Sequence, residues 1–132
     1  MATKANLMGL GEGPFLAGVQ ATDPSTAIAA GSTLGDATAI GGQQYLISLT
    51  TTPASAGVKL PNIGGSTGCL LGDDFIINNQ GANTVIVYVS NSSTISISGV
   101  NVAGATGCTI STHKSATFYA LTTTSWLGIL SS

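Results

Sequence analysis

The chain has 132 residues and a mass of 13.0 kDa, which is the size of one ordinary domain. Only 6% of its residues are charged, whereas about a quarter are charged in an average soluble domain. Its three cations are too few for the basic surface that binds nucleic acid or an anionic membrane. One histidine and two cysteines exclude a zinc site of four cysteines, or of two cysteines and two histidines.

The sequence also argues against a membrane span and a secretion signal. No apolar run approaches the ~18 residues that a spanning helix needs. The start, MATKANLMGLGEGPF, has a single lysine, and Glu12 and Pro14 interrupt any apolar segment. We therefore expect a protein that is made in the cytoplasm.

Residues 1–42 differ from the rest of the chain and are predicted to form an extended arm. They hold 8 of the 18 glycines, and their apolar residues follow no sustained period. Asp23-Pro24-Ser25 resembles a helix start, which allows a short helical turn around residues 25–30. The exposed leucine, methionine and phenylalanine side chains of such an arm would need a surface on which to dock.

From residue 43 onward, apolar and polar residues alternate as they do in β-strands. Turn residues separate these short strands, which recur about every 8–12 residues. The pattern predicts an all-β fold for residues 43–132, as one antiparallel β-sandwich or jelly-roll domain. The predicted strands are 45–49, 75–77, 85–89, 94–98, 116–121 and 126–130.

Three of these strands, 45–49, 85–89 and 126–130, are apolar on both faces. A small antiparallel sandwich normally exposes one face of each sheet to water. We therefore expect the second face to be covered by another copy of the chain or by a partner.

One motif resembles a catalytic site. Gly64-Gly65-Ser66-Thr67-Gly68 matches the nucleophile elbow of serine hydrolases, and Asp73 or Asp74 and then His113 follow in the hydrolase order. The elbow requires a helix after the serine, and the sequence leaves no room for one. We interpret the motif as a turn and predict that the protein is not an enzyme.

Other polar and aromatic residues have structural interpretations that we prefer to functional ones. Asp73-Asp74 could contribute oxygen ligands to Ca²⁺ together with Asn78 and Asn79, but paired aspartates also mark the solvated start of a strand. His113 is expected in a turn, and no metal or cofactor is expected. Cys69 and Cys108 could pair, but reduced thiols are favoured without a secretion signal. The aromatic residues are expected in the core or in a subunit interface rather than in a sugar-binding platform: Tyr88, Phe118, Tyr119 and Trp126.

Most of the chain resembles a known group of virion proteins, although the match is loose between residues 20 and 57. The chain resembles the small capsid decoration proteins of tailed phages, also called cement or head-fibre proteins. The resemblance lies in the opening Met1-Ala2-Thr3-Lys4-Ala5-Asn6-Leu7-Met8-Gly9-Leu10-Gly11, then Val58-Lys59-Leu60-Pro61, Phe75-Ile76-Ile77-Asn78-Asn79, Val85-Ile86-Val87-Tyr88, Ala116-Thr117-Phe118-Tyr119-Ala120 and Ser125-Trp126.

The resemblance implies a β-sandwich or jelly-roll that forms a homotrimer on the outside of an HK97-type capsid shell. The expected partners are the major capsid protein and two further copies of the chain, and the expected location is the virion surface. A trimeric tail or head fibre knob that binds a host receptor or glycan is the alternative. The arm residues expected to bind the capsid are Asn6, Leu7, Met8, Leu10, Phe15 and Leu16. The residues expected at the subunit interface are Val87, Val89, Leu127 and Ile129.

Overall fold

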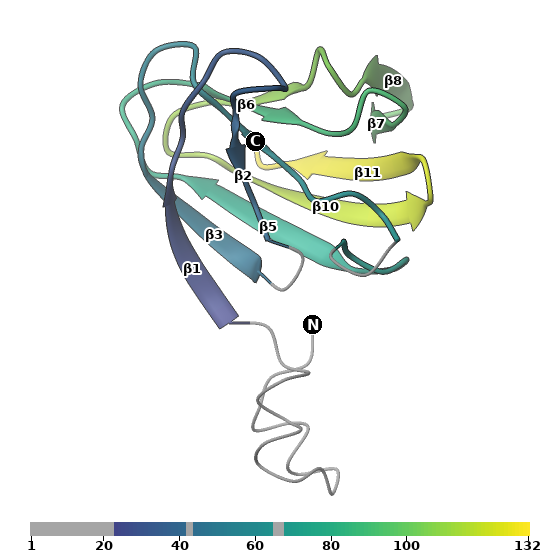
Figure 1. The fold of residues 1–132 in the computed structure, drawn as a ribbon. Coiled ribbons are helices and arrows are strands. Elements are labelled where there is room, and N and C mark those ends of the chain that lie inside the picture. Colours follow the sequence, from purple (N-terminus) through teal and green to yellow (C-terminus); the bar gives the residue numbers. More distant parts are fainter. Residues whose placement is uncertain (1–22, 42–43, 65–67) are drawn as a thin grey trace, which may run out of the picture.

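The computed structural model describes residues 23–41, 44–64 and 68–132. These residues form two β-sheets and no helix (Figure 1), so the predicted all-β fold is confirmed. The strands are β1 (Asp23–Ile28), β2 (Thr38–Ala39), β3 (Gln44–Thr51), β4 (Gly57–Lys59), β5 (Asp74–Asn79), β6 (Val85–Tyr88), β7 (Thr94–Ile97), β8 (Val100–Ala103), β9 (Cys108–Ile110), β10 (Ser115–Thr122) and β11 (Ser125–Leu130).

The first half of the chain alternates between the two sheets. β1, β3 and β5 lie side by side in a seven-stranded sheet, and β2, β4 and β6 lie side by side in a four-stranded sheet. Each crossing reverses the chain direction, so strands two apart in sequence run parallel. The expected antiparallel or jelly-roll arrangement is therefore wrong for this half. The alternation of side chains that predicts a strand carries no information about its direction.

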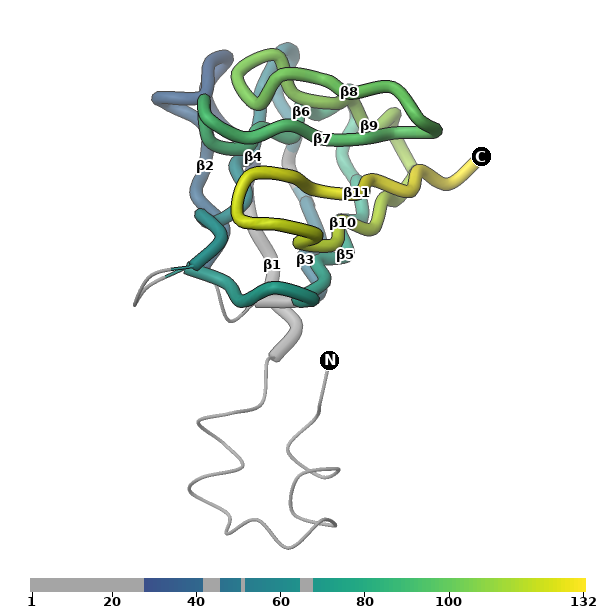
Figure 2. The backbone as a smooth tube through the Cα atoms, turned by 90° about the vertical axis from the view of Figure 1, so that its right-hand side faces the viewer, coloured from purple at the N-terminus to yellow at the C-terminus, as the bar shows by residue number. Residues whose placement is uncertain are grey.

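The second half of the chain is mainly antiparallel. The β10–β11 hairpin lies between β5 and β7, so that it joins the two parts of the seven-stranded sheet (Figure 2). The strand order in that sheet is β1-β3-β5-β10-β11-β7-β8. The four-stranded sheet has the order β2-β4-β6-β9, with β9 antiparallel to β6.

The expected boundary at residue 42 between arm and β domain is wrong. Residues 23–28 and 38–39 are strands of the two sheets, since β1 pairs with β3 and β2 pairs with β4. Ala29, Ala37 and Ile40 are buried. The helical turn expected around residues 25–30 is a strand instead. Pro24 is compatible with that strand because β1 is at the edge of its sheet.

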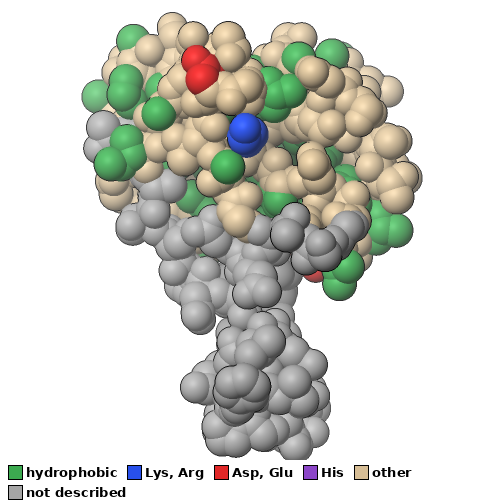
Figure 3. Space-filling view, in the orientation of Figure 1, with side chains coloured by type: hydrophobic (Ala, Val, Ile, Leu, Met, Phe, Trp, Pro, Cys, Tyr) green, Lys and Arg blue, Asp and Glu red, His purple; other side chains and the backbone are tan. Residues whose placement is uncertain are grey.

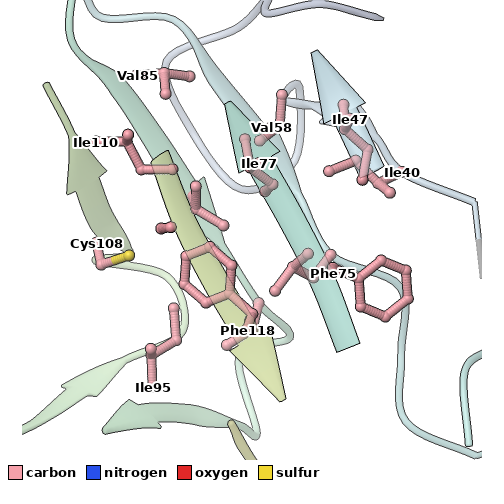
Figure 4. Close-up of a cluster of buried hydrophobic side chains, with 14 of the residues drawn as sticks. Ile40, Ile47, Val58, Phe75, Ile77, Val85, Ile95, Cys108, Ile110 and Phe118 are labelled. Carbon is pink, nitrogen blue, oxygen red and sulfur yellow. The ribbon is translucent and has the colours of Figure 1, made fainter. Parts of the chain in front are cut away.

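The hydrophobic core lies between the two sheets. Figure 4 shows Phe75, Ile77 and Phe118, from the seven-stranded sheet, in one cluster with Val58 and Val85 from the four-stranded sheet. Its largest side chains are Trp126, Phe75 and Phe118, and the Phe75 and Trp126 rings meet edge to face at 5.8 Å between centroids. Buried and half-buried residues alternate along β5 and along most of β10, as the period-two pattern of the sequence predicts.

A buried amide joins the loops at one end of the sandwich. Asn79 is fully buried at the end of β5, and its Nδ2 donates to the carbonyl oxygens of Asn83, Ile110 and Ser111 at 2.9–3.3 Å. Its Oδ1 accepts the N–H of Gly81 at 3.0 Å. One side chain therefore satisfies two buried backbone groups, the Ile110 carbonyl and the Gly81 N–H, and two part-buried carbonyls.

We predict that Asn79→Ala lowers the free energy of unfolding by roughly 2–4 kcal/mol, because it removes the side-chain hydrogen bonds of the Ile110 carbonyl and the Gly81 N–H in a buried environment. Asn78→Ala is the matched control. Its side chain is on the opposite face of β5, and we expect a change below about 0.5 kcal/mol. Urea unfolding measures both values. Equal losses in the two variants would show that the Asn79 amide has no special role.

The turn between β7 and β8 consists of two residues in the left-handed region. Ser98 has a φ of 51° and Gly99 a φ of 83°, and Ile97 pairs with Val100 directly across the turn. Positive φ at both positions is the pattern of a type I′ turn, whose twist matches that of the flanking strands. A Cβ on Gly99 would meet no atom within 4 Å, so a substitution there tests backbone strain alone.

We predict that Gly99→Ala lowers the free energy of unfolding by about 1 kcal/mol, because an alanine disfavours the left-handed region. Gly35→Ala is the control. Its φ is not in that region, and its new Cβ would meet only the Thr33 hydroxyl at 3.8 Å. Thermal unfolding should show a lower Tm for Gly99→Ala only. An unchanged Tm in Gly99→Ala would contradict the assigned turn.

Candidate interaction surfaces

The four residues expected at a subunit interface fall into two groups. Val87 and Val89 are 0% and 1% exposed and belong to the core between the sheets. A second chain cannot reach them, so their assignment to an interface is wrong. Leu127 is half-buried and Ile129 is 53% exposed, and both alternate with the inward-facing Trp126 and Gly128 on β11. Of the four expected interface residues, Leu127 and Ile129 are therefore the two that another molecule could contact.

The outer face of β6, which we expected a partner to cover, is covered by the chain itself. Tyr88 points away from the core, yet it is only 3% exposed, and its hydroxyl donates to the Ser32 carbonyl oxygen at 2.9 Å. Ser32 lies in the loop between β1 and β2. Gly57 gives the Tyr88 ring room, because a Cβ there would come within 2.5 Å of the ring.

The outer face of the seven-stranded sheet has no such cover among the described residues. Register partners place aliphatic side chains and one threonine in a row across β3, β5, β10 and β11, and Tyr119 pairs with Leu127 beside that row. We call this surface the outer sheet face, and its members are Leu46, Ile76, Thr117, Tyr119, Leu127 and Ile129. All are half-buried or exposed.

Charge is scarce around this face. We considered the members of the outer sheet face and their register partners on neighbouring strands. Among these described residues, the one charged residue is Asp74, which pairs with Tyr119. Figure 3 shows that charged side chains are also few and isolated on the face of the molecule that it draws. A surface of this kind has little electrostatic penalty for being covered by another protein.

A second surface feature is a hollow of about 430 Å³ at the edge of the four-stranded sheet. Because β2, β4 and β6 are parallel, the residues after their carboxyl ends gather at one place. These residues are Ile40 after β2, Leu60-Pro61-Asn62 after β4 and Ser90-Asn91 after β6. Leu34 and Gly35, from the loop between β1 and β2, complete the wall. We call this feature the strand-end hollow.

The strand-end hollow contains one cation. Lys59 is the last residue of β4 and lines the hollow. Within the described residues, neither its ammonium nor the amides of Asn62 and Asn91 have a hydrogen-bond or ion-pair partner. The other described lining residues are mostly aliphatic, and none of them is acidic. The hollow therefore offers one positive charge and two free amides beside an apolar wall.

The described residues do not bring together the side chains expected for a serine hydrolase site or a Ca²⁺ site. Ser66 lies outside the described residues, and strand β5 begins at Asp74, where a nucleophile elbow would require a helix. His113 is exposed in the turn before β10. Asn78 and Asn79 point to opposite faces of β5, and the Asn79 amide is fully engaged. Among the described residues, no three His, Cys, Asp or Glu side chains could together hold a metal ion.

Tyr88, Phe118, Tyr119 and Trp126 do not form a platform. Trp126 and Phe118 are core residues, Tyr88 is covered by Ser32, and only Tyr119 contributes to an outer surface. The expectation that aromatic residues serve the core is confirmed for Trp126 and Phe118.

Cys69 and Cys108 are both free and buried. Burial raises the pKa of the Cys69 thiol to about 11, and the charge of Asp73 adds to this effect. Burial alone raises the pKa of the Cys108 thiol to about 12. Both thiols are therefore kept protonated and shielded, which is the environment of inert structural cysteines.

We predict that a disulfide reagent modifies the native thiols at pH 8 on the order of 100-fold more slowly than the unfolded thiols. A thiol whose pKa is higher in the folded than in the unfolded chain stabilises the fold. This stabilisation is fully present at pH values below the unfolded pKa of about 9. That stability is lost as pH rises from there toward about 11 and 12. Alkaline unfolding curves should show a smaller decline in Cys108→Ala. Rapid labelling of the native chain would contradict this prediction.

The six arm residues expected to bind a capsid, Asn6 to Leu16, lie outside the described residues. In the described part of the chain, no helix is long and apolar enough to cross a lipid bilayer. Comparisons with known proteins found no matching family model, no matching curated sequence and no matching solved structure.

Proposed function

We propose that this chain is a structural virion protein that decorates the outside of an HK97-type phage capsid as a homotrimer. The observation that carries the proposal is the outer sheet face, which is apolar, poor in charge and uncovered by any described part of its own chain. Faces of this kind are typical of subunit contacts. The sequence resemblance to decoration proteins supports the capsid as the site of assembly.

The two contacts of the proposed protein are assigned to different parts of the chain. The outer sheet face, around Leu127 and Ile129, binds sister subunits. The arm, through Asn6, Leu7, Met8, Leu10, Phe15 and Leu16, binds the major capsid protein. Additional buried area across the seams between capsomers would then resist the internal pressure of packaged DNA.

We predict a solution mass of three times the chain mass of 13.0 kDa by light scattering. Ile129→Asp should shift the mass toward the monomer, because a charge would be buried without a partner. Val100→Asp is the matched control, since Val100 is 64% exposed on edge strand β8, outside the outer sheet face. A wild-type monomer, or an unchanged mass in Ile129→Asp, would contradict the assigned interface.

Co-sedimentation with capsids that lack the protein tests the capsid contact. We expect the full chain to saturate them, in numbers comparable to the major capsid protein, and deletion of residues 2–20 to reduce occupancy strongly. Full occupancy by the deletion variant would overturn the role of the arm. A copy number limited to a few fibres per virion would instead favour the receptor-binding knob.

A further inference from the structure

We propose that the strand-end hollow is a binding site for the carboxylate of an acidic sugar, such as a uronic acid. This proposal is independent of the decoration role, because it concerns a different surface from the outer sheet face. It follows from the residues that gather at the carboxyl ends of the parallel strands β2, β4 and β6.

The charge of the hollow selects the anion. Lys59 supplies one ammonium, and none of the described residues that line the hollow is acidic. Asp36, in the loop between β1 and β2, is not among the residues that line the hollow, and its Oδ1 accepts hydrogen bonds from the N–H and the hydroxyl of Thr33. One ammonium balances one carboxylate, whereas a phosphate monoester carries about −1.5 to −2 charges and would be left partly unbalanced.

The neutral groups of the hollow indicate that the carboxylate belongs to a sugar. The amides of Asn62 and Asn91 each offer donors and an acceptor, and neither has a partner within the described residues. Sugar hydroxyls also donate and accept, so they complement such amides. The aliphatic side chains of Leu34 and Leu60 and the Pro61 ring can contact the C–H face of a sugar ring.

The size and position of the hollow agree with a small ligand. Its volume of about 430 Å³ lies within the roughly 300–1,000 Å³ of small-molecule sites. Ile40 and Leu60 are 4% and 3% exposed, so the floor is anchored in the core and preformed. In contrast, Lys59, Asn62 and Asn91 can be changed without opening the core, because they are half-buried or exposed.

The test is an NMR titration of the isotope-labelled full chain with sodium D-galacturonate. We expect shifts in the backbone amides of Leu34, Ile40 and Leu60, with a Kd on the order of 1 mM. Lys59→Gln should weaken binding by about tenfold or more, because a charge-assisted hydrogen bond is lost. Asn91→Ala should weaken it less, because it removes a neutral partner.

Lys114→Gln is the matched control, because Lys114 is exposed and its Nζ donates to the Ser132 carbonyl oxygen outside the hollow. Its affinity for galacturonate should equal that of the wild type. Galactose tests the sugar ring without the carboxylate, and sodium acetate tests the carboxylate without the sugar ring. Each should bind more weakly than galacturonate. Equal binding of galactose would overturn the role of charge, and equal binding of acetate would overturn the sugar.

Two further results would overturn the proposal as a whole. One is the absence of shifts at the hollow at saturating galacturonate. The other is unchanged binding by Lys59→Gln while its circular dichroism and Tm match the wild type. Neither result would bear on the oligomeric state, so failure here is distinguishable from failure of the decoration role.

Discussion

The alternation of strands between two sheets is the constraint on which the other features depend. Each of the first six strands lies in the sheet opposite to its predecessor, so neighbours within a sheet are two strands apart in sequence and run parallel. Parallel neighbours share one carboxyl edge. The buried amide of Asn79 and the strand-end hollow around Lys59 both use residues at or just after such strand ends.

The same winding leaves the two sheets with different outer faces. The four-stranded sheet is narrow enough for the loop between β1 and β2 to fold over it and to seal Tyr88 against Gly57. The seven-stranded sheet is wider, and its central strands expose Leu127 and Ile129 instead. Strands that are apolar on both faces therefore have two different explanations in this chain. One is an internal cover, and the other is a surface suited to another molecule.

Six of the eleven described strands were predicted from the sequence, and their arrangement was predicted poorly. Alternation located β5, β7, β10 and β11 because a period of two depends only on neighbouring residues. It could not give strand direction, and it could not distinguish an inner face from a covered outer face, which is why Val87 and Val89 were misassigned. β1 was missed because Pro24 and the polar residues around it obscure its pattern, and its only strand partner, β3, begins 21 residues later.

The strand-end hollow could not be found in the sequence at all. Lys59, Asn62 and Asn91 have no common spacing, and only the parallel order of β4 and β6 brings them together. Asn62 and Asn91 each lie three residues beyond the end of a strand, β4 and β6. Without strand direction, those ends could not be assigned to the same edge of a sheet.

The position of the β10–β11 hairpin has a consequence for how the chain folds. β1, β3 and β5 form one part of the wide sheet and β7 and β8 the other, and only the last strands of the chain join them. The joining hairpin also brings Phe118 and Trp126 to the core. A nascent chain that ends before residue 115 would therefore expose unpaired edges on both β5 and β7. Such long-range closure is typical of slow folding, so the chain remains vulnerable to wrong pairing until β10 and β11 have left the ribosome.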